Sequence, residues 1–590
     1  MSPRLHLPMR TLCLVGSTLV LLNCSSGSAN KTGAAGTHGT AGSTGTAGAS
    51  GAGTAGASAG QAGATGTAGS GAGQAGATAG ATGKAGATGT AGGAAGTGPG
   101  TAGVTGTAGQ MGATGVAGIG ATGNSVTTRN NHETRDGFFI QPMLTKMKAA
   151  TMAPDTAFAA NFTGGMWASP LYLENGPGGK GAFFAVTLGD MVYALDETTG
   201  ATVWMHSIGT APPNGFAGCG NTTGITSTPV IDVASRTIYV AGVVNGAGGV
   251  AHEIHALSVD DGTEKPGGWP VSVGNLKGNG TLAFHQAAYN QRSALSLVNG
   301  ILYVGYGGHV GDCNDYHGWV VAVNTANPAM AAAWSTGGQG EAIWAAGGMA
   351  SNGNGVFAVT GNANGGGAVH QDSEEVVHVT GMAQVDRTTG IFYPTNWRDM
   401  DGRDLDFGAV SPVVITVPGA TPATLVAATA KNGHFYLLDP NQLGNSTMGG
   451  GALVDYMIAG DGMSIRAAQA AYVSTTGVHV VMNASNTNCP MGTNGGIISV
   501  LVGPGKPPTA TVAWCAGGGQ SPIATSPDGK IETIVWNYNG GLKGYDGDTG
   551  APVASPMGNC GSVRSWTSPI AVKGRIVVGA DGKLCSWSSH

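Results

Sequence analysis

One short pattern, repeated along the chain, constrains its fold more than any other feature. The clearest copy is GDMVYALDETTGATVW, which runs from Gly189 to Trp204. Apolar and polar residues alternate up to Asp196, which predicts a strand. Asp196 to Gly200 predicts a tight turn, because Asp hydrogen-bonds the backbone ahead of it and Gly adopts a positive φ without steric cost. Ala201 to Trp204 predicts the returning strand, so the pattern encodes a β-hairpin.

The hairpin pattern recurs after residue 128. Seven copies begin near residues 189, 254, 320, 382, 435, 497 and 542. Their spacing of roughly 45–65 residues falls in the range of propeller blades. A Ser-Pro or Thr-Pro pair leads into several of the units, at Ser169-Pro170, Thr228-Pro229, Ser411-Pro412, Ser521-Pro522 and Ser568-Pro569. Proline is tolerated at the first residue of a strand, so each unit predicts four strands that begin with this pair.

The C-terminal unit is incomplete. Ser568–Trp587 predicts three strands, and no fourth strand follows. We expect the missing strand to come from Thr156–Gly164, because a ring that closes in this way has no open sheet edge. The predicted fold class is therefore all-β, an eight-bladed β-propeller with seven blades as the fallback, preceded by a disordered low-complexity linker.

The N-terminus predicts export. Arg4 and Arg10 supply a positively charged region before an apolar run, Leu12 to Leu22, that is too short to span a bilayer. The run ends in LLNC at Cys24 and resembles a bacterial lipoprotein cleavage box, although Asn23 replaces the usual small residue. We expect residues 1–23 to be a lipoprotein-type signal peptide and Cys24 to carry lipid. Plain secretion is the alternative.

Residues 24–128 form a spacer of Gly, Ala, Thr and Ser. Glycine makes up 108 of the 590 residues, and most of the excess lies in this tract. A three-residue glycine period resembles collagen, but the phase slips after Gly51 and Pro99 is the only proline of the tract. We expect a flexible, mobile linker, with a short interrupted triple helix as the alternative. Residues 129–590 are the predicted propeller.

Charge and cysteine content narrow the function classes. Only 9% of the residues are charged and the net charge is −6, so no basic surface for nucleic acid is expected. Of eight cysteines, Cys13 lies in the signal and Cys24 in the lipid box. The other six are an even number in an exported chain, which indicates disulfides. Local closure favours Cys489 with Cys515 and Cys560 with Cys585, whereas Cys219 and Cys313 have no such signal. No Cys-x-x-Cys-His occurs, which excludes covalent haem.

The repeats resemble those of pyrroloquinoline-quinone (PQQ)-type β-propellers. This resemblance covers Thr156 to the C-terminus and implies that the repeat tryptophans pack between neighbouring blades, namely Trp204, Trp269, Trp334, Trp397 and Trp514. It identifies the fold better than the function, because such folds carry many functions.

Three stretches resemble the cofactor site of the quinoprotein alcohol dehydrogenases. Ala342–Gly365 resembles the segment whose Trp lies under the quinone and whose Asn binds calcium, which implies Trp344 and Asn362. Trp397–Ala409 resembles the segment with the catalytic Asp, which implies Asp404 or Asp406. Ala430–Asp439 resembles the segment with a cofactor-binding Lys, which implies Lys431. These residue types suit a flat ring and a hard cation.

Two features depart from those dehydrogenases. No two cysteines are adjacent, and the region that supplies a calcium-binding Glu reads Gly-Ala-Gly-Gly, with Glu253 in the wrong strand phase. A separate loop holds His309, Asp312, Asp315 and His317, which we expect to be structural rather than metal-binding.

Two functions follow. The sequence favours a lipid-anchored propeller at the outer membrane or cell surface, otherwise periplasmic or secreted, that binds a protein or glycan without catalysis and without a cofactor. The rival is an exported quinoprotein dehydrogenase that oxidises an alcohol or sugar with PQQ and Ca²⁺. A structural envelope protein would require the glycine tract to be ordered.

The lipid anchor gives a direct test. Cys24→Ser removes the thiol that would be acylated, so the protein should move from the membrane fraction to the soluble fraction on cell fractionation. A protein that stays in the same fraction after this change would leave ordinary secretion as the explanation.

Overall fold

The computed structural model describes residues 124–213, 223–246, 248–310, 312–365, 369–460, 465, 467–485, 487–490 and 495–589. The predicted signal peptide, Cys24, Cys219 and nearly all of the glycine tract lie outside these residues. No helix in the described ranges is both long and apolar enough to cross a membrane.

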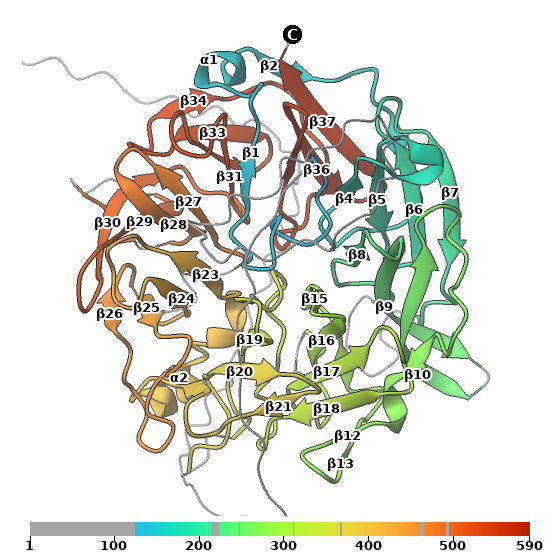
Figure 1. Ribbon diagram of the computed structural model, residues 1–590, viewed down its shortest axis with the longest axis vertical. Helices are drawn as coiled ribbons and strands as arrows, with labels where there is room; N and C mark the ends of the chain where they lie inside the picture. The colour runs from blue at the N-terminus through green and yellow to red at the C-terminus, as the bar shows by residue number, and fades with distance from the viewer. Residues whose placement is uncertain are drawn as a thin grey trace, which may run out of the picture. The chain divides into compact units, whose positions relative to one another are not determined.

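Eight antiparallel sheets are arranged in a ring, so the eight-bladed β-propeller is confirmed (Figure 1). Blades 1 to 4 comprise β4 (Leu171–Leu173), β5 (Ala182–Val186), β6 (Met191–Asp196) and β7 (Thr202–Ser207); β8 (Val230–Asp232), β9 (Thr237–Gly246), β10 (Gly249–Ser258) and β11 (Val271–Ser272); β15 (Ser296–Val298), β16 (Ile301–Gly308), β17 (Trp319–Asn324) and β18 (Ala331–Ser335), with β14 (Tyr289–Asn290) paired to β16; and β19 (Val356–Val359), β20 (Val376–Thr380), β21 (Gln384–Val385) and β22 (Ile391–Phe392).

Blades 5 to 8 continue the ring. They comprise β23 (Val413–Thr416), β24 (Thr424–Thr429), β25 (His434–Leu438) and β26 (Val454–Met457); β27 (Ala470–Ser474), β28 (Gly477–Asn483), β29 (Ile497–Gly503) and β30 (Thr509–Ala516); β31 (Ile523–Ser526), β32 (Ile534–Tyr538), β33 (Leu542–Asp546) and β34 (Pro552–Ala554); and β35 (Ile570–Val572), β36 (Arg575–Ala580) and β37 (Lys583–Ser589). The remaining elements are a hairpin of β12 (Lys277–Gly278) and β13 (Leu282–Ala283), the helices α1 (Lys146–Ala149) and α2 (Trp397–Arg403), and the 3₁₀ turns η1 (Pro177–Gly179), η2 (Val273–Asn275) and η3 (Phe407–Ala409).

The repeat pattern forms the hairpins that it predicts. Asp196 accepts hydrogen bonds from the backbone N–H groups of Thr198 and Thr199 at 3.1 and 2.8 Å, and Gly200 has a φ of +76°. The Ser-Pro and Thr-Pro pairs also behave as predicted. The first strands of blades 1, 2, 5, 7 and 8 each begin at the residue after the proline.

The N-terminal segment completes blade 8, as the sequence predicts. β3 (Ala160–Asn161) lies within the predicted stretch and pairs with Leu584 and Lys583 of β37. The pairing also includes β2 (Met152–Pro154), which lies upstream of that stretch and pairs with the end of β37. Residues from both ends of the described chain therefore form one sheet.

Residues 126–141, here called the axial segment, run through the centre of the ring. Within it, β1 (Phe138–Ile140) adds a parallel strand beside β31 (Figure 1). The sequence did not predict this strand. Backbone groups of the segment bond to Tyr172, Ile231, Ser351, Val414, Ala471 and Ala524, which belong to the inner sides of blades 1, 2, 4, 5, 6 and 7.

Two arginines of the axial segment bond to the other two blades. Arg135 donates to the Leu295 carbonyl at 2.7 Å in blade 3, and Arg129 donates to Ser568 Oγ at 3.0 Å beside blade 8. Both guanidinium groups are fully buried. One short segment is thus bonded to every blade of the propeller.

The repeat tryptophans pack across the seams between blades in two clear cases. Trp204 of blade 1 donates to the Val259 carbonyl of blade 2 at 2.9 Å, and Trp514 of blade 6 donates to the Gly547 carbonyl of blade 7 at 2.8 Å. A Cβ on Gly262, in the turn that Trp204 covers, would lie 2.6 Å from the indole. The glycine of one repeat therefore makes room for the tryptophan of the preceding repeat.

One tryptophan is misplaced by the sequence pattern. Trp397 was expected to end an outer strand, but it begins α2, and β22 ends earlier at Phe392. Pro394 follows this strand and has no N–H to continue the ladder, and Asn396 is the helix N-cap.

Both disulfides favoured by the sequence are confirmed. Cys489 is bonded to Cys515 and Cys560 to Cys585, each with a Cα–Cα distance of 5.8 Å.

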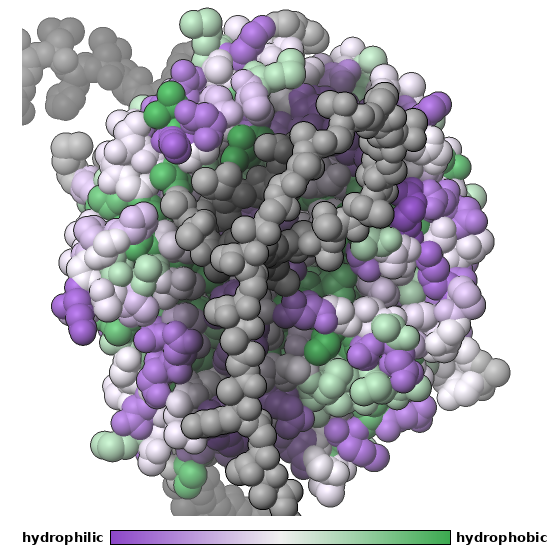
Figure 2. Space-filling model, viewed as in Figure 1, coloured by the Kyte–Doolittle hydropathy of each residue, from purple (hydrophilic) through white to green (hydrophobic). Residues whose placement is uncertain are grey.

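On the face shown in Figure 2, hydrophobic side chains are scattered among hydrophilic ones around the rim.

The blade seams give a prediction about stability. Trp514 is 4% exposed, so Trp514→Ala should lower the free energy of unfolding by about 3–5 kcal/mol through lost packing and a new cavity. The exposed Met457 in the neighbouring blade serves as control, because Met457→Ala should change the free energy of unfolding by less than ~0.5 kcal/mol. Denaturant unfolding measures both. Equal losses would mean that the seam contact does not stabilise the ring.

Candidate functional site

The five residues that the family resemblance implies come from four separate segments around blades 4 and 5. Trp344 lies in the linker into blade 4, and Asn362 follows β19. Asp404 and Asp406 lie between α2 and η3, in the linker into blade 5. Lys431 lies in the turn from β24 to β25. Hydrogen bonds and ring contacts bring all five together.

Lys431 is the centre of the group. Its Nζ lies 2.7 Å from Oδ1 of Asp404 and 2.6 Å from Oδ2 of Asp406. The ammonium also lies 5.6 Å from the centroid of the Trp344 ring. Lys431 and Asp406 are buried, whereas the side chain of Asp404 is 47% exposed. Asp404 is therefore the carboxylate of the pair that an incoming molecule reaches.

Asn362 lies directly against Asp406. Its backbone N–H donates to Oδ1 of Asp406 at 3.0 Å. Its side-chain amide also faces this carboxylate, and with the nitrogen turned toward it, Nδ2 donates to Oδ2 at 3.1 Å. Asn362 and Asp406 thus present an amide and a carboxylate at one point.

Burial and mutual attraction have opposite effects on the pKa values of Asp406 and Lys431. Burial raises the pKa of Asp406 above its usual range, and the charge of Lys431 limits this rise. Burial also acts to lower the pKa of Lys431, but the two carboxylates raise it overall. The lysine therefore stays charged and holds the site together electrostatically.

Glu374 is a second buried carboxylate that the sequence analysis missed. It is 0% exposed, and its Oε2 accepts the Phe407 N–H at 2.7 Å. Its Oε1 is buried and has no hydrogen-bond partner. Burial, and next the charge of Asp406, raise the pKa of Glu374 well above its usual range. This is an acceptor without a donor, next to the predicted group.

The backbone of Glu374 is also unusual. Its φ is +54°, in the left-handed region, and Asp404 has a φ of +57°. Such conformations cost of order 1–3 kcal/mol in residues other than glycine, and they cluster at functional sites. The only signal in the sequence was the pair Glu374-Glu375 immediately before a buried strand.

Other predicted positions do not join the group. Glu253 pairs with His255 in blade 2, at 3.5 Å, consistent with its wrong strand phase. In the loop of His309, Asp312 accepts a hydrogen bond from Tyr316 at 2.7 Å, and Asp315 lies 4.0 Å from His317. Across the described ranges, no three His, Cys, Asp or Glu side chains gather in a way that would hold a metal ion.

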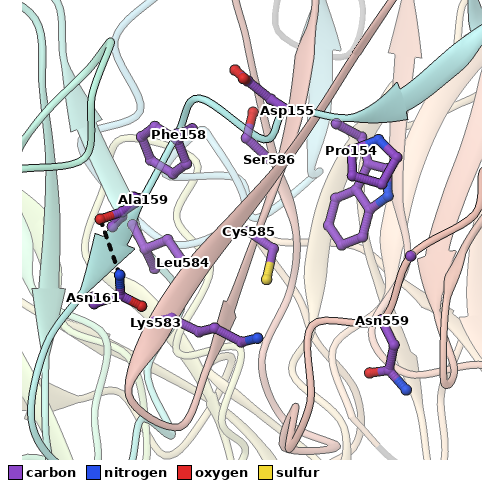
Figure 3. A pocket seen from close by; sticks show the side chains of 13 residues that line it. Pro154, Asp155, Phe158, Ala159, Asn161, Asn559, Lys583, Leu584, Cys585 and Ser586 are labelled. Carbon is purple, nitrogen blue, oxygen red and sulfur yellow. Dashed lines mark hydrogen bonds between the residues drawn. The ribbon is translucent and has the colours of Figure 1, made fainter.

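A cavity of about 190 Å³ lies far from these residues in the fold, at the outer edge of blade 8 (Figure 3). It forms beside β37, where the loop that joins β2 to β3 bulges away from this strand. Its lining includes Phe158, Lys583 and Cys585. Asn161 donates there to the Ala159 carbonyl at 3.3 Å. None of the predicted site residues reaches this cavity.

No protein-family model and no curated protein sequence matches the chain. Solved structures do. A quinohemoprotein alcohol dehydrogenase from Comamonas testosteroni has a TM-score of 0.53 and 12% identity, covering 79% of this chain and 80% of that chain. A quinohemoprotein alcohol dehydrogenase from Pseudomonas putida HK5 has a TM-score of 0.55 at the same identity and coverage. The fold is therefore the β-propeller of the quinoprotein alcohol dehydrogenases, as the repeats predict.

The ion-pair group makes a pH-dependent prediction. Lys431→Met should destabilise the protein by about 3–5 kcal/mol at neutral pH, because it leaves Asp406 buried without a counter-charge. The loss should shrink as the pH falls through the raised pKa of Asp406, since the protonated acid needs no partner.

Asp404→Asn is the matched control, because it removes the half-exposed carboxylate and leaves the buried pair intact. Its unfolding free energy should change by less than about 1 kcal/mol. A loss for Lys431→Met that is constant from pH 4 to pH 8 would contradict the assignment.

Proposed function

We propose that this chain is an exported dehydrogenase of the quinoprotein type, which oxidises an alcohol or a sugar with PQQ and a divalent cation. One observation supports it most. Residues from four separate segments meet at one place with a second buried carboxylate, Glu374, one oxygen of which has no hydrogen-bond partner. This reverses the order of the two functions that the sequence favoured, because a binding module has no need of such costly buried acids.

The acceptors at the site fit a hard cation. Asp406 and Glu374 offer two carboxylates, and Asn362 adds an amide oxygen when that oxygen, rather than the nitrogen, faces Asp406; these are the oxygen ligands that Ca²⁺ takes. The unpartnered Oε1 of Glu374 is the clearest evidence, since a buried acceptor without a donor is costly unless something binds it. Burial, and next the charge of Asp406, raise the pKa of Glu374, and a cation here would offset both effects.

The site also fits a flat, acidic ring. Trp344 presents an indole face, with Lys431 at 5.6 Å and Arg292 at 4.9 Å from its centroid. Aromatic rings stack on such a face, and the two cations suit the carboxylates of a quinone cofactor. When bound, the quinone supplies the two-electron acceptor for the oxidation.

Asp404 is the candidate base. Its carboxylate is half-exposed, and Lys431 holds one of its oxygens at 2.7 Å. The ammonium orients Asp404, so its other oxygen is available to accept the hydroxyl proton of an alcohol. Asp406 is buried behind it and bonded to Asn362, so its role is to hold the cation rather than to meet substrate.

A non-catalytic binding module is the second candidate. It is favoured by the closed contact of Lys431 with both Asp404 and Asp406, which already neutralises part of the negative charge. The absence of adjacent cysteines in the sequence also favours it. In that case the axial face would bind a protein or glycan.

Export to an oxidising compartment, with a lipid anchor at Cys24, belongs to the same proposal. The two disulfides of blades 6 and 8 support it, because such bonds persist outside the cytosol. The anchor would place the propeller at the outer membrane or cell surface.

Cofactor uptake tests the proposal. Purified full-length protein mixed with PQQ and Ca²⁺, then separated from free PQQ, should retain quinone absorbance. Glu374→Gln and Trp344→Ala should each lower this uptake at least tenfold, whereas Asp404→Asn should keep the uptake and abolish alcohol oxidation. Wild-type protein that retains no quinone would leave the binding module as the better explanation.

A further inference from the structure

The cavity at the outer edge of blade 8, here called the rim pocket, takes no part in the functions proposed above. It exists because residues 155–159 bulge away from β37 between β2 and β3 (Figure 3). This bulge is fixed at both ends. The Asp155 N–H donates to the Ser586 carbonyl and the Ala159 N–H donates to the Thr199 carbonyl, each at 2.8 Å.

The segment after β34, which supplies another wall of the pocket, is fixed as well. The disulfide between Cys560 and Cys585 ties this segment to β37. The Nε1–H of Trp587 donates to the Met557 carbonyl at 3.2 Å. The walls of the rim pocket are therefore held in place by the fold, and a ligand would bind without first ordering them.

The volume of the rim pocket limits the size of its ligand. The cavity measures about 190 Å³. At ~30 Å³ for each water, that is room for about six waters. Pockets for drug-sized molecules measure roughly 300–1,000 Å³. The rim pocket therefore suits one small ring and its substituents.

Apolar side chains form part of the lining. Phe158 is 7% exposed and Leu584 is 2% exposed, and Figure 3 shows them next to each other. The ring of Phe158 is held edge-on against Phe183, with centroids 5.5 Å apart. A ligand in the pocket thus has an aromatic and an aliphatic side chain to pack against.

Two side chains of the lining have hydrogen-bond donors to offer. Oδ1 of Asn559 accepts the Tyr538 hydroxyl at 3.0 Å and the Gly561 N–H at 2.6 Å, which leaves its NH₂ group for a ligand. The ammonium of Lys583 forms no ion pair with any acid among the described residues.

Two other side chains have acceptors to offer. Nδ2 of Asn161 donates to the Ala159 carbonyl at 3.3 Å, which leaves its Oδ1 for a ligand. Oδ1 of Asp155 accepts the Ala157 N–H at 3.1 Å, and a carboxylate accepts several hydrogen bonds. Figure 3 shows Asp155 and Lys583 at opposite ends of the group of lining residues.

Ser586 gives the clearest evidence for a ligand. It lines the pocket and is 3% exposed, and its hydroxyl is buried without a hydrogen-bond partner. Such a group is costly to bury unless something bonds to it. A hydroxyl both donates and accepts, so its best partner is a group that does the same.

We propose that the rim pocket binds a single neutral pyranose sugar. The hydroxyls of a sugar both donate and accept, which matches a lining that holds donors, acceptors and the hydroxyl of Ser586. One lysine and one aspartate balance in charge, so the lining favours neither an anion nor a cation. The C–H groups of the ring would pack on Phe158 and Leu584. This site shares no residue with the cation group, and it stands whether or not the chain is a dehydrogenase.

Sugar binding to the full-length protein without cofactor tests the proposal. Ligand-observed NMR and isothermal titration would measure the affinities of the methyl pyranosides of glucose, galactose, mannose and N-acetylglucosamine. At least one of them should bind, and acetate and inorganic phosphate should not displace it. No binding by any of the four sugars, or displacement by either anion, would overturn the proposal.

The variant Ser586→Ala separates a ligand-binding hydroxyl from a structural one. It should weaken sugar binding roughly two- to tenfold, the effect of one lost neutral hydrogen bond. It should not lower the midpoint of denaturant unfolding, because the hydroxyl has no partner in the protein. An unchanged sugar affinity would mean that the sugar binds elsewhere, and the proposal would be wrong.

A matched pair of lysine variants completes the design. Lys583→Met removes the ammonium but keeps a long side chain, so it should weaken sugar binding roughly threefold or more. Lys530→Met, at an exposed turn of blade 7 outside the pocket, should have no effect. Equal effects of the two changes would contradict the assignment. A disaccharide that ends in the preferred sugar distinguishes the sources: if it binds as tightly as the methyl glycoside, the ligand is the end of a glycan, and if it does not bind, the ligand is a free sugar.

Discussion

Closure of the ring is the constraint on which the rest of this structure depends. A propeller with an open seam would expose the edges of two sheets, and here two N-terminal strands, β2 and β3, cover the edge of β37. The sixteen residues of the axial segment make a second set of contacts, because they bond to the inner side of every blade. The N-terminal part of the described chain is therefore bonded to later parts at two places, the rim of blade 8 and the axis. These bonds join into one body blades that otherwise contact only their neighbours.

The axial segment also determines where chemistry can occur. Its bonds occupy the inner sides of the blades, next to the linkers that lead into the inner strands. Trp344, Arg292 and Trp566 lie in these linkers, and Arg129 fixes the carbonyls beside two of them. The candidate site therefore depends partly on contacts of the axial segment, although none of the segment's residues belongs to the cation group.

The sequence predicted what is encoded locally and missed what depends on distant contacts. Asp196 and Gly200 specify a hairpin by themselves, and Ser-Pro pairs mark inner strands, so the blades could be found without a structure. Trp397 was misassigned because Pro394 ends the strand before the tryptophan is reached. Glu374 and Arg292 could not be found, because each owes its importance to residues of other segments, Asp406 for the first and Trp566 for the second. The three residues of β1 are too few to show a periodicity.

The two groups of unmet polar atoms are opposite in sign and adjacent, and this relation explains more than either does alone. Glu374 offers a buried acceptor without a donor, while Arg292 and Trp167 offer buried donors without an acceptor. Each such group costs about 1–3 kcal/mol in an empty protein. Trp344 contacts both groups, since Lys431, which pairs with the acids, and Arg292 both lie over its ring. A ligand set that carries both a cation and a carboxylate would satisfy both groups at once, which is the combination that a metal-bound, acidic aromatic molecule presents.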